Sequence, residues 1–263
     1  MILSIVDLSE LSLLIVLLLI HVASSLVILF IVQKYCSWLN LRDGGIFGTI
    51  FGNTMPTLVG FIFAFVTVAA WQNHNSVGDT VSKEAHTLFN LYQILDAYPK
   101  DLRIDGQNQL IAYTQDIINQ EWPKLNDQQF DLDTSKKLNQ INFLFVTHKP
   151  SSFGELAMHN EGLRLLSTYR DLRRDRIESA KSFIEKPLWG ALVLSAYLLL
   201  IYSAFFKTRN IRIHSIMMAL VGASLGVMFF LLTIYDNPFR GPSAIEPLPF
   251  QKILNSISVI QKQ

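Results

Sequence analysis

The sequence has 263 residues, half of them hydrophobic, and only 16% are Asp, Glu, Lys or Arg. A soluble domain usually carries about 25% charged residues, so the composition argues against a soluble protein. The formal net charge of +1 argues against a nucleic-acid-binding surface, which would show a basic excess. The single cysteine, Cys36, excludes an internal disulfide.

Four long segments without a charged residue predict four membrane-spanning helices. The segments are 11–32, 46–71, 187–206 and 213–235. Each has about the 20 residues that a helix needs to cross a hydrocarbon core of about 30 Å. The first segment is too long for a signal peptide and follows acidic residues, so we interpret it as a retained span. We therefore predict an all-α polytopic membrane protein.

The spans form two hairpins, because the loop within each pair is short and short loops make neighbouring helices antiparallel. We expect a first hairpin over residues 1–71, a helical soluble domain over 72–186, a second hairpin over 187–235 and a tail over 236–263. With an even number of spans, both termini and the soluble domain lie on the same side of the membrane. Basic residues near span ends favour the cytoplasm, and this side has slightly more of them, in a run over 170–186, than the loops on the other side, so charge alone leaves the topology open.

Apolar residues at helical spacing recur through the soluble domain and predict four helices there. The last apolar stripe leads from Leu156 to Ile184. We expect this helix to run straight into the third span, with Pro187 at a kink or a restart. Its interleaved charges, such as Arg174 and Glu178 at i,i+4 spacing, are interpreted as a solvated face.

The second span combines small and polar residues within a hydrophobic stretch. Its glycines recur every four residues at Gly44, Gly48 and Gly52, and the same ridge continues to Gly60. Because this spacing lets helices approach closely in lipid, we interpret these glycines as helix-packing residues, together with Gly222 and Gly226 of the fourth span.

Two faces of the second span are candidates for a pore lining. Asn53 and Thr57 lie one helical turn apart, and a water-filled path and helix packing are both open for them. The other face carries Met55, Val59 and Phe63. This face would contact lipid or, if it faced a symmetry axis, form apolar rings that can gate ions by expelling water.

The segment from Asp236 to Phe250 is rich in Pro and Gly, and we expect an ordered, extended turn rather than a helix. Asp236 and Glu246 are weak candidates as ligands of a hard cation, because Ca²⁺ needs six or more oxygens. For this segment we favour a capped helix end over a cation site. The histidines lack metal-ligand spacing and no catalytic motif is present, so we predict neither an enzyme nor a bound cofactor.

Two stretches together resemble the bestrophin superfamily of pentameric ion channels. The first runs from Met55-Pro56 through Gly60-Phe61 to Trp71, and resembles the second span of bestrophins. The second is the motif that follows the fourth span, with Asp236, Asn237, Pro238, Phe239 and Gly241. A family of bacterial bestrophin-like membrane proteins shares an Asp-x-Pro-Phe-x-Gly motif at this place, and the chain resembles this family more closely.

The resemblance implies five subunits around one axis, with the second span lining the pore and the termini and soluble domain in the cytoplasm. Alignment on Gly60-Phe61 implies that Asn53, Thr57 and Phe61 line the pore. Alignment on Pro56 implies Met55, Val59 and Phe63. The acidic cluster that binds calcium in animal bestrophins is missing from this tail, which puts calcium gating in doubt.

From these features we expect a homo-oligomeric ion channel, a pentamer in a bacterial inner membrane, with anions favoured over cations. Its partners would be the lipid bilayer, further copies of the chain and inorganic ions, and no nucleic acid. The alternative is a membrane-anchored sensory or interaction module, in which the soluble domain binds a ligand or a partner protein.

Overall fold

The computed structural model describes residues 8–35, 45–126, 131–206 and 210–261, with the side chains of residues 45–53 and of Asn126 outside the description. These residues form helices and no β-strand, which confirms the all-α prediction. The chain divides into two compact units. The span unit comprises Met1–His74 and Ser182–Ala244, and the domain unit comprises Asn75–Lys181 and Ile245–Gln263.

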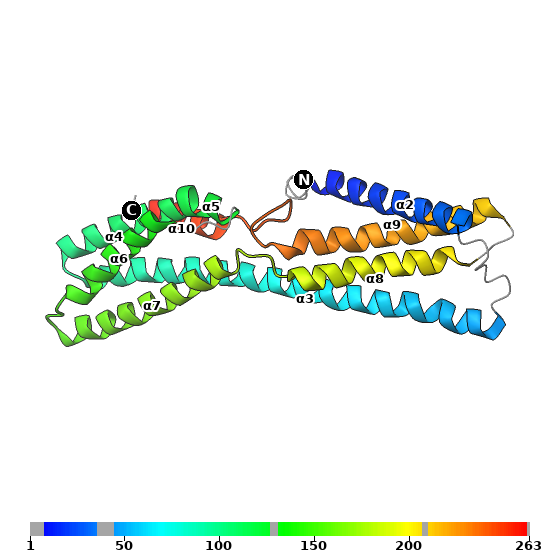
Figure 1. Ribbon diagram of the computed structural model, residues 1–263. Helices are drawn as coiled ribbons and strands as arrows, with labels where there is room; N and C mark the ends of the chain where they lie inside the picture. The colour runs from blue at the N-terminus through cyan, green and yellow to red at the C-terminus, as the bar shows by residue number, and fades with distance from the viewer. Residues whose placement is uncertain (1–7, 36–44, 127–130, 207–209, 262–263) are drawn as a thin grey trace. The chain divides into compact units, whose positions relative to one another are not determined.

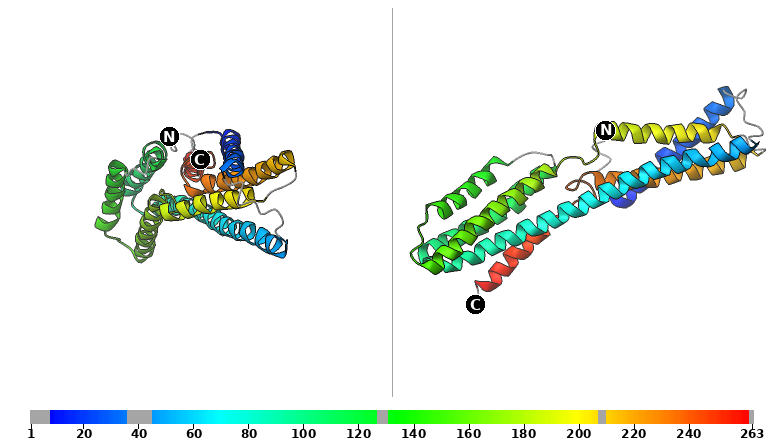
Figure 2. Two further views of the ribbon diagram at one scale, coloured as in Figure 1. Left: turned by 45° about the vertical axis from the view of Figure 1, so that its right-hand side comes forward. Right: turned by 90° about the horizontal axis from the view of Figure 1, so that it is seen from below.

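Four helices are long and apolar enough to cross a membrane, as predicted. They are α2 (Glu10–Tyr35), α3 (Gly45–Ile94), α8 (Lys186–Ala204) and α9 (Ile211–Asp236). In the span unit, α2 packs mainly against α9, and α8 contacts both α2 and α9 (Figures 1 and 2). The apolar side chains that these helices leave exposed suit a lipid environment, where only internally bonded backbone is tolerated. The chain is therefore a multi-pass membrane protein.

The second span does not end where its apolar residues end. Helix α3 has 50 residues, of which those up to His74 belong to the span unit and those from Asn75 to the domain unit. The sequence between Gly60 and Gly78 contains no Pro or Gly that would end the helix. The sequence predicts the second span and the first helix of the soluble domain as separate elements, because hydropathy changes there, but helical propensity does not change and the structure has one helix.

The last helix of the soluble domain is separate from the third span, contrary to the sequence-based prediction. Seven residues separate the end of helix α7 (Phe153–Glu178) from the beginning of α8. Pro187 lies in the first turn of α8, where its missing N–H costs no hydrogen bond. The alternative of a helix restart at this proline is therefore correct.

The domain unit is built from the second part of α3, α4 (Lys100–Asp116), α6 (Leu132–Thr147), α7 and α10 (Leu248–Ile260). Short segments η2 (Leu95–Ala97), η3 (Ile117–Glu121) and α5 (Trp122–Asn126) connect them, and η3 is a π-helical turn. The predicted apolar stripes of α3, α4 and α6 are buried. On α7 the prediction was partly wrong, since Leu156 is 42% exposed.

The tail contains a helix that the sequence analysis did not predict. Helix α10 begins at Leu248, with Pro249 in its first turn, so the expectation of an extended turn is wrong from this residue on. Its apolar side chains at helical spacing, Phe250, Ile253 and Ile257, are buried in the domain unit. The prolines before α10 indicate a turn, and for this reason the short amphipathic helix that follows them was not predicted.

Candidate functional site

The two candidate pore-lining faces of α3 differ in where they lie. Val59 is buried and Phe63 is fully buried in the core of the span unit. The Phe63 ring meets Phe229 of α9 edge to face, with 5.1 Å between the ring centroids. Met55 is half-buried beside this core. This face of α3 is therefore used for packing within the chain.

The opposite face of α3 points away from the core of its own chain. Thr57 is exposed, and Phe61, one turn further on, is 59% exposed. Phe65 and Val68 extend the same exposed stripe towards the end of the span. Asn53 lies within α3, but its side chain is outside the described residues. An exposed stripe of this kind contacts either lipid or another copy of the chain.

The candidate packing glycines fall into different surroundings. A Cβ atom on Gly222 would lie 2.7 Å from the His21 carbonyl oxygen, and one on Gly226 would lie 2.9 Å from the Leu18 Cα atom, so both glycines lie against the α2 backbone. Gly60 has no atom within 4 Å of the corresponding position. Gly44 lies outside the described residues, and so do the surroundings of Gly48 and Gly52 in α3.

Asp236, the last residue of α9, binds the chain segment that leads into α8. Its carboxylate accepts hydrogen bonds from the Ser182 hydroxyl at 2.5 Å, the Ile184 N–H at 2.7 Å and the Trp189 indole N–H at 3.2 Å. Its carbonyl oxygen accepts a fourth bond, from the Phe183 N–H at 2.8 Å. We call this group the Asp236 clasp. It joins the beginning and the end of the second hairpin.

The rest of the motif after the fourth span forms a turn. The Asn237 side-chain oxygen accepts a hydrogen bond from the Phe239 N–H across Pro238, and the Phe239 ring is buried. Gly241 has a φ of 92°, which other residues rarely adopt. The motif therefore has a structural basis in the turn itself.

The described residues offer no group of three or more His, Cys, Asp or Glu side chains that could hold a metal ion. Three donors already bind the Asp236 carboxylate, and Glu246 is exposed in the domain unit. Neither Asp236 nor Glu246 therefore belongs to a group of side chains that could coordinate a cation among the described residues.

A buried network of four charged residues, which the sequence patterns did not predict, lies in the domain unit. The Arg176 guanidinium donates to both carboxylate oxygens of Glu84, at 2.6 and 3.1 Å, and to Glu121 at 2.5 Å. Arg173 forms an ion pair with Glu121 and donates to the Ser135 hydroxyl at 3.0 Å. The network joins α3, α6, α7 and the π-helical turn η3.

Electrostatics and aromatic contacts keep Arg176 charged although it is fully buried. Burial alone would lower the pKa of Arg176, but the adjacent Glu84 and Glu121 outweigh it and raise that pKa. Burial raises the pKa of Glu84, and the charge of Arg176 partly offsets this effect. The guanidinium carbon lies 5.1 Å from the centre of the Trp122 ring and 5.9 Å from that of Phe250 in α10.

The sequence carried one signal for this network. Leu166, Tyr169, Arg173 and Arg176 follow 3-4-3 spacing, so the two arginines continue the apolar face of α7. Arg174, which is off that face, is exposed. Spacing therefore distinguishes the buried arginines from the solvated one, whereas residue type does not.

A second polar cluster lies where α7 begins. His148 Nε2 lies 2.7 Å from Glu155 Oε1, and the Ser151 hydroxyl and N–H donate to the other Glu155 oxygen. These bonds lower the pKa of Glu155 to about 2. His159 Nδ1 lies 2.8 Å from the Tyr98 hydroxyl, and burial lowers the pKa of His159.

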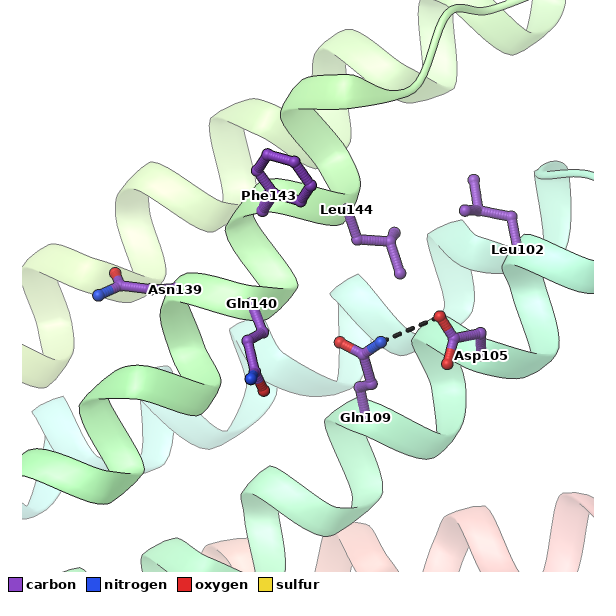
Figure 3. Close-up of a pocket in the computed structure, with 7 residues that line it drawn as sticks. All are labelled: Leu102, Asp105, Gln109, Asn139, Gln140, Phe143 and Leu144. Atoms are coloured by element: carbon purple, nitrogen blue, oxygen red, sulfur yellow. Dashed lines mark hydrogen bonds between the residues drawn. The ribbon is translucent and has the colours of Figure 1, made fainter.

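An open groove of about 640 Å³ separates α4 from α6 in the domain unit. Leu102 and Leu144 line one part of it, and Gln109 and Gln140 point into it (Figure 3). Gln109 donates to Asp105 at 3.0 Å, while its buried Oε1 has no partner among the described residues. The groove mixes apolar and amide groups and contains no catalytic combination of side chains within the described part of the chain.

Comparison with known proteins identifies the family. A family model described as a bestrophin-like domain matches residues 16–250. The fold is similar to the crystal structure of a membrane protein variant, with a TM-score of 0.64, 14% identity, and coverage of 94% of this chain and 96% of that one.

It is also similar to a variant of a bacterial bestrophin homologue from Klebsiella pneumoniae, with a TM-score of 0.62, 15% identity and the same coverage. The comparison with curated proteins gives no match. Because the family model covers most of the sequence, the resemblance found in the two short motifs is confirmed, and the chain belongs to the bestrophin-like family.

Proposed function

We propose that this protein is a homo-oligomeric ion channel whose pore is lined by the exposed face of α3, including Thr57 and Phe61. The observation that carries the proposal is the contrast between the two faces of this span. Val59 and Phe63 are buried in their own chain, whereas Thr57 and Phe61 are exposed. Only the exposed face is available to line a path between copies of the chain.

A pore between copies agrees with the packing of a single chain. Apolar side chains fill the centre of the span unit, among them Leu29, Phe63, Leu192, Leu225 and Phe229. Such a core excludes water and ions. Conduction therefore requires several copies in a closed ring, and we propose five. A ring of Phe61 side chains would form an apolar constriction that gates by expelling water.

We favour anions as the conducted ions. The edge of an aromatic ring carries partial positive charge, so Phe61 rings that turn their edges to the axis attract anions. The polar side chain of Thr57 lies one turn away on the same exposed face. Cations would be favoured instead by carboxylates on this face, and the described part of the α3 span, Thr54–Trp71, carries none.

We propose a bacterial inner membrane as the location, with both termini and the domain unit in the cytoplasm. Support comes from Lys181 and Lys186, which stand close to the start of the third span, where basic residues favour the cytoplasmic side. Reporter fusions at the C-terminus, active on one side of the membrane only, test this orientation. A periplasmic C-terminus would contradict it.

The function is tested by ion flux through the purified protein in liposomes, with chloride and sodium gradients measured separately. We expect chloride flux in the parent, a several-fold increase in Phe61→Ala, which widens the constriction, and altered flux in Thr57→Val. Phe30→Ala is the matched control, because Phe30 is a 64% exposed phenylalanine on α2. Its flux should equal that of the parent.

The mass of the particle in detergent tests the oligomer, since a pentamer has about 150 kDa of protein, five times the 29.9 kDa of one chain. No flux from well-folded oligomers, even in Phe61→Ala, would favour the sensory or interaction module. Equal flux changes in Phe61→Ala and Phe30→Ala would refute the assignment of this face to the pore.

A further inference from the structure

A groove between α6 and α7 of the domain unit is lined by three arginines. Its volume is about 470 Å³, enough for a small organic molecule. From α6 it is lined by Ser135, Leu138 and Asn139, and from α7 by Arg170, Arg173, Arg174, Ile177 and Glu178. This combination of guanidinium, amide, hydroxyl and aliphatic groups is typical of a binding site rather than of a solvated helix face.

Arg173 and Arg174 lie three and four residues after Arg170, so each is a neighbour of Arg170 on the helix surface, and all three border the groove. Arg173 is buried, and its bonds to Glu121 and Ser135 fix it as a wall of the groove. Its charge is compensated there by Glu121. The attraction for a ligand therefore comes from Arg170 and Arg174 at the more open side.

These two outer arginines make only weak interactions in the chain. Arg170 donates to the Asn139 side-chain oxygen at 3.1 Å, and Asn139 lines both this groove and the one between α4 and α6 (Figure 3). Arg174 donates to Asp171 at 2.9 Å, and both side chains are exposed. An exposed ion pair contributes little to stability, so a ligand can replace it.

We propose that this groove binds an oxyanion, a phosphate or carboxylate group carried by a small molecule with an apolar part. Arginine N–H groups bind such oxygens in pairs, which gives both strength and orientation. The Asn139 amide N–H groups supply neutral donors. Leu138 and Ile177 accommodate the apolar part. Binding at this site does not depend on whether the spans conduct ions.

Glu178 is the single acidic residue among those that line the groove. It repels a second negative group at its end of the groove, so a ligand with one anionic end and one apolar end fits best. We therefore expect phenyl phosphate to bind more tightly than inorganic phosphate.

Calorimetric titration of both probes into the full-length protein in phosphatidylcholine nanodiscs, at constant ionic strength in chloride, tests the proposal. We expect saturable binding that weakens about tenfold or more when Arg170→Gln and Arg174→Gln are combined. Arg164→Gln is the control, since Arg164 is an exposed arginine of the same helix, pairs with Glu161 three residues earlier and lies outside this groove. Its affinity should equal that of the parent.

No binding to the parent, or equal affinities in the parent and the double variant, would overturn the proposal. Nanodiscs that contain phosphatidylglycerol distinguish a lipid phosphate from a soluble one. If the groove takes a lipid headgroup, these nanodiscs weaken the binding of phenyl phosphate to the parent. If the natural ligand is soluble, the affinity is the same in both lipids.

Discussion

Replacing Arg176 by methionine isolates the contribution of the buried charge network to the domain unit. The side chain is fully buried, and methionine keeps much of its aliphatic volume. The substitution removes the hydrogen bonds to Glu84 and Glu121 while leaving both carboxylates in place. These carboxylates are then buried with only Arg173 to compensate them.

The expected cost is large because the partners cannot reach water. Removing one member of a buried ion pair typically costs about 3–5 kcal/mol, since it leaves an uncompensated buried charge. The contact of the guanidinium with Trp122 and Phe250 is lost as well. For a unit of this size, such a loss lowers the apparent Tm by about 10 °C or more.

The assay is thermal unfolding of the purified protein in detergent, followed by tryptophan fluorescence at one fixed heating rate, because membrane proteins often unfold irreversibly. Arg174→Met is the matched control from the same helix. Its exposed pair with Asp171 is worth about 0–1 kcal/mol, so its Tm should barely change. Adding Glu84→Gln to Arg176→Met removes one buried charge and should recover part of the loss.

The reasoning fails if Arg176→Met and Arg174→Met lower the Tm equally. It also fails if Glu84→Gln makes the Arg176→Met protein less stable still, because the buried charge would then not be the cause of the loss.

Three further predictions concern packing, the clasp and pH. Gly226→Val should destabilise the protein by about 1–3 kcal/mol, because the added side chain overpacks against α2. Gly60→Val should lower the Tm much less than Gly226→Val does, because an added side chain there meets no atom within 4 Å. Equal losses of Tm in the two variants would contradict this packing. Asp236→Ala should expose the beginning of α8 to proteolysis near Ser182, and unchanged cleavage would refute a clasp. Because burial lowers the pKa of His159 below 6.5, its neutral form stabilises the fold above pH 6.5, and this contribution is lost as the pH falls towards the lowered pKa. The Tm difference between the parent and His159→Gln should therefore shrink from pH 7.5 to 5.5, and a constant difference would exclude this linkage.

Hydropathy and length were sufficient to predict the four spans, because crossing a bilayer requires about 20 apolar residues whatever the partner helices are. Helix ends were harder to predict. Nothing between Gly60 and Gly78 breaks α3, while α7 ends at Glu178 although none of the next eight residues is a proline or glycine. Tertiary contacts, the clasp on Ser182 among them, decide where that helix ends.

The candidate site was only partly accessible from the sequence for a similar reason. The 3.6-residue period separates Thr57 and Phe61 from Val59 and Phe63, but it does not say which face packs against α9. The interleaved charges of α7 predict a solvated face because charged residues are rarely buried without partners. The partner of Arg176, Glu84, is 92 residues away in the chain, and sequence spacing carries no information about such a distance.

The Asp236 clasp also sets an order of events in biosynthesis. Ser182 leaves the ribosome 54 residues before its partner, so at about 5–20 residues per second the clasp cannot close for roughly 3–11 seconds. During this interval the N–H groups of Phe183 and Ile184 are without Asp236, which accepts from them in the folded chain. Only a completed fourth span supplies Asp236, so the clasp forms only after the whole second hairpin has been synthesised.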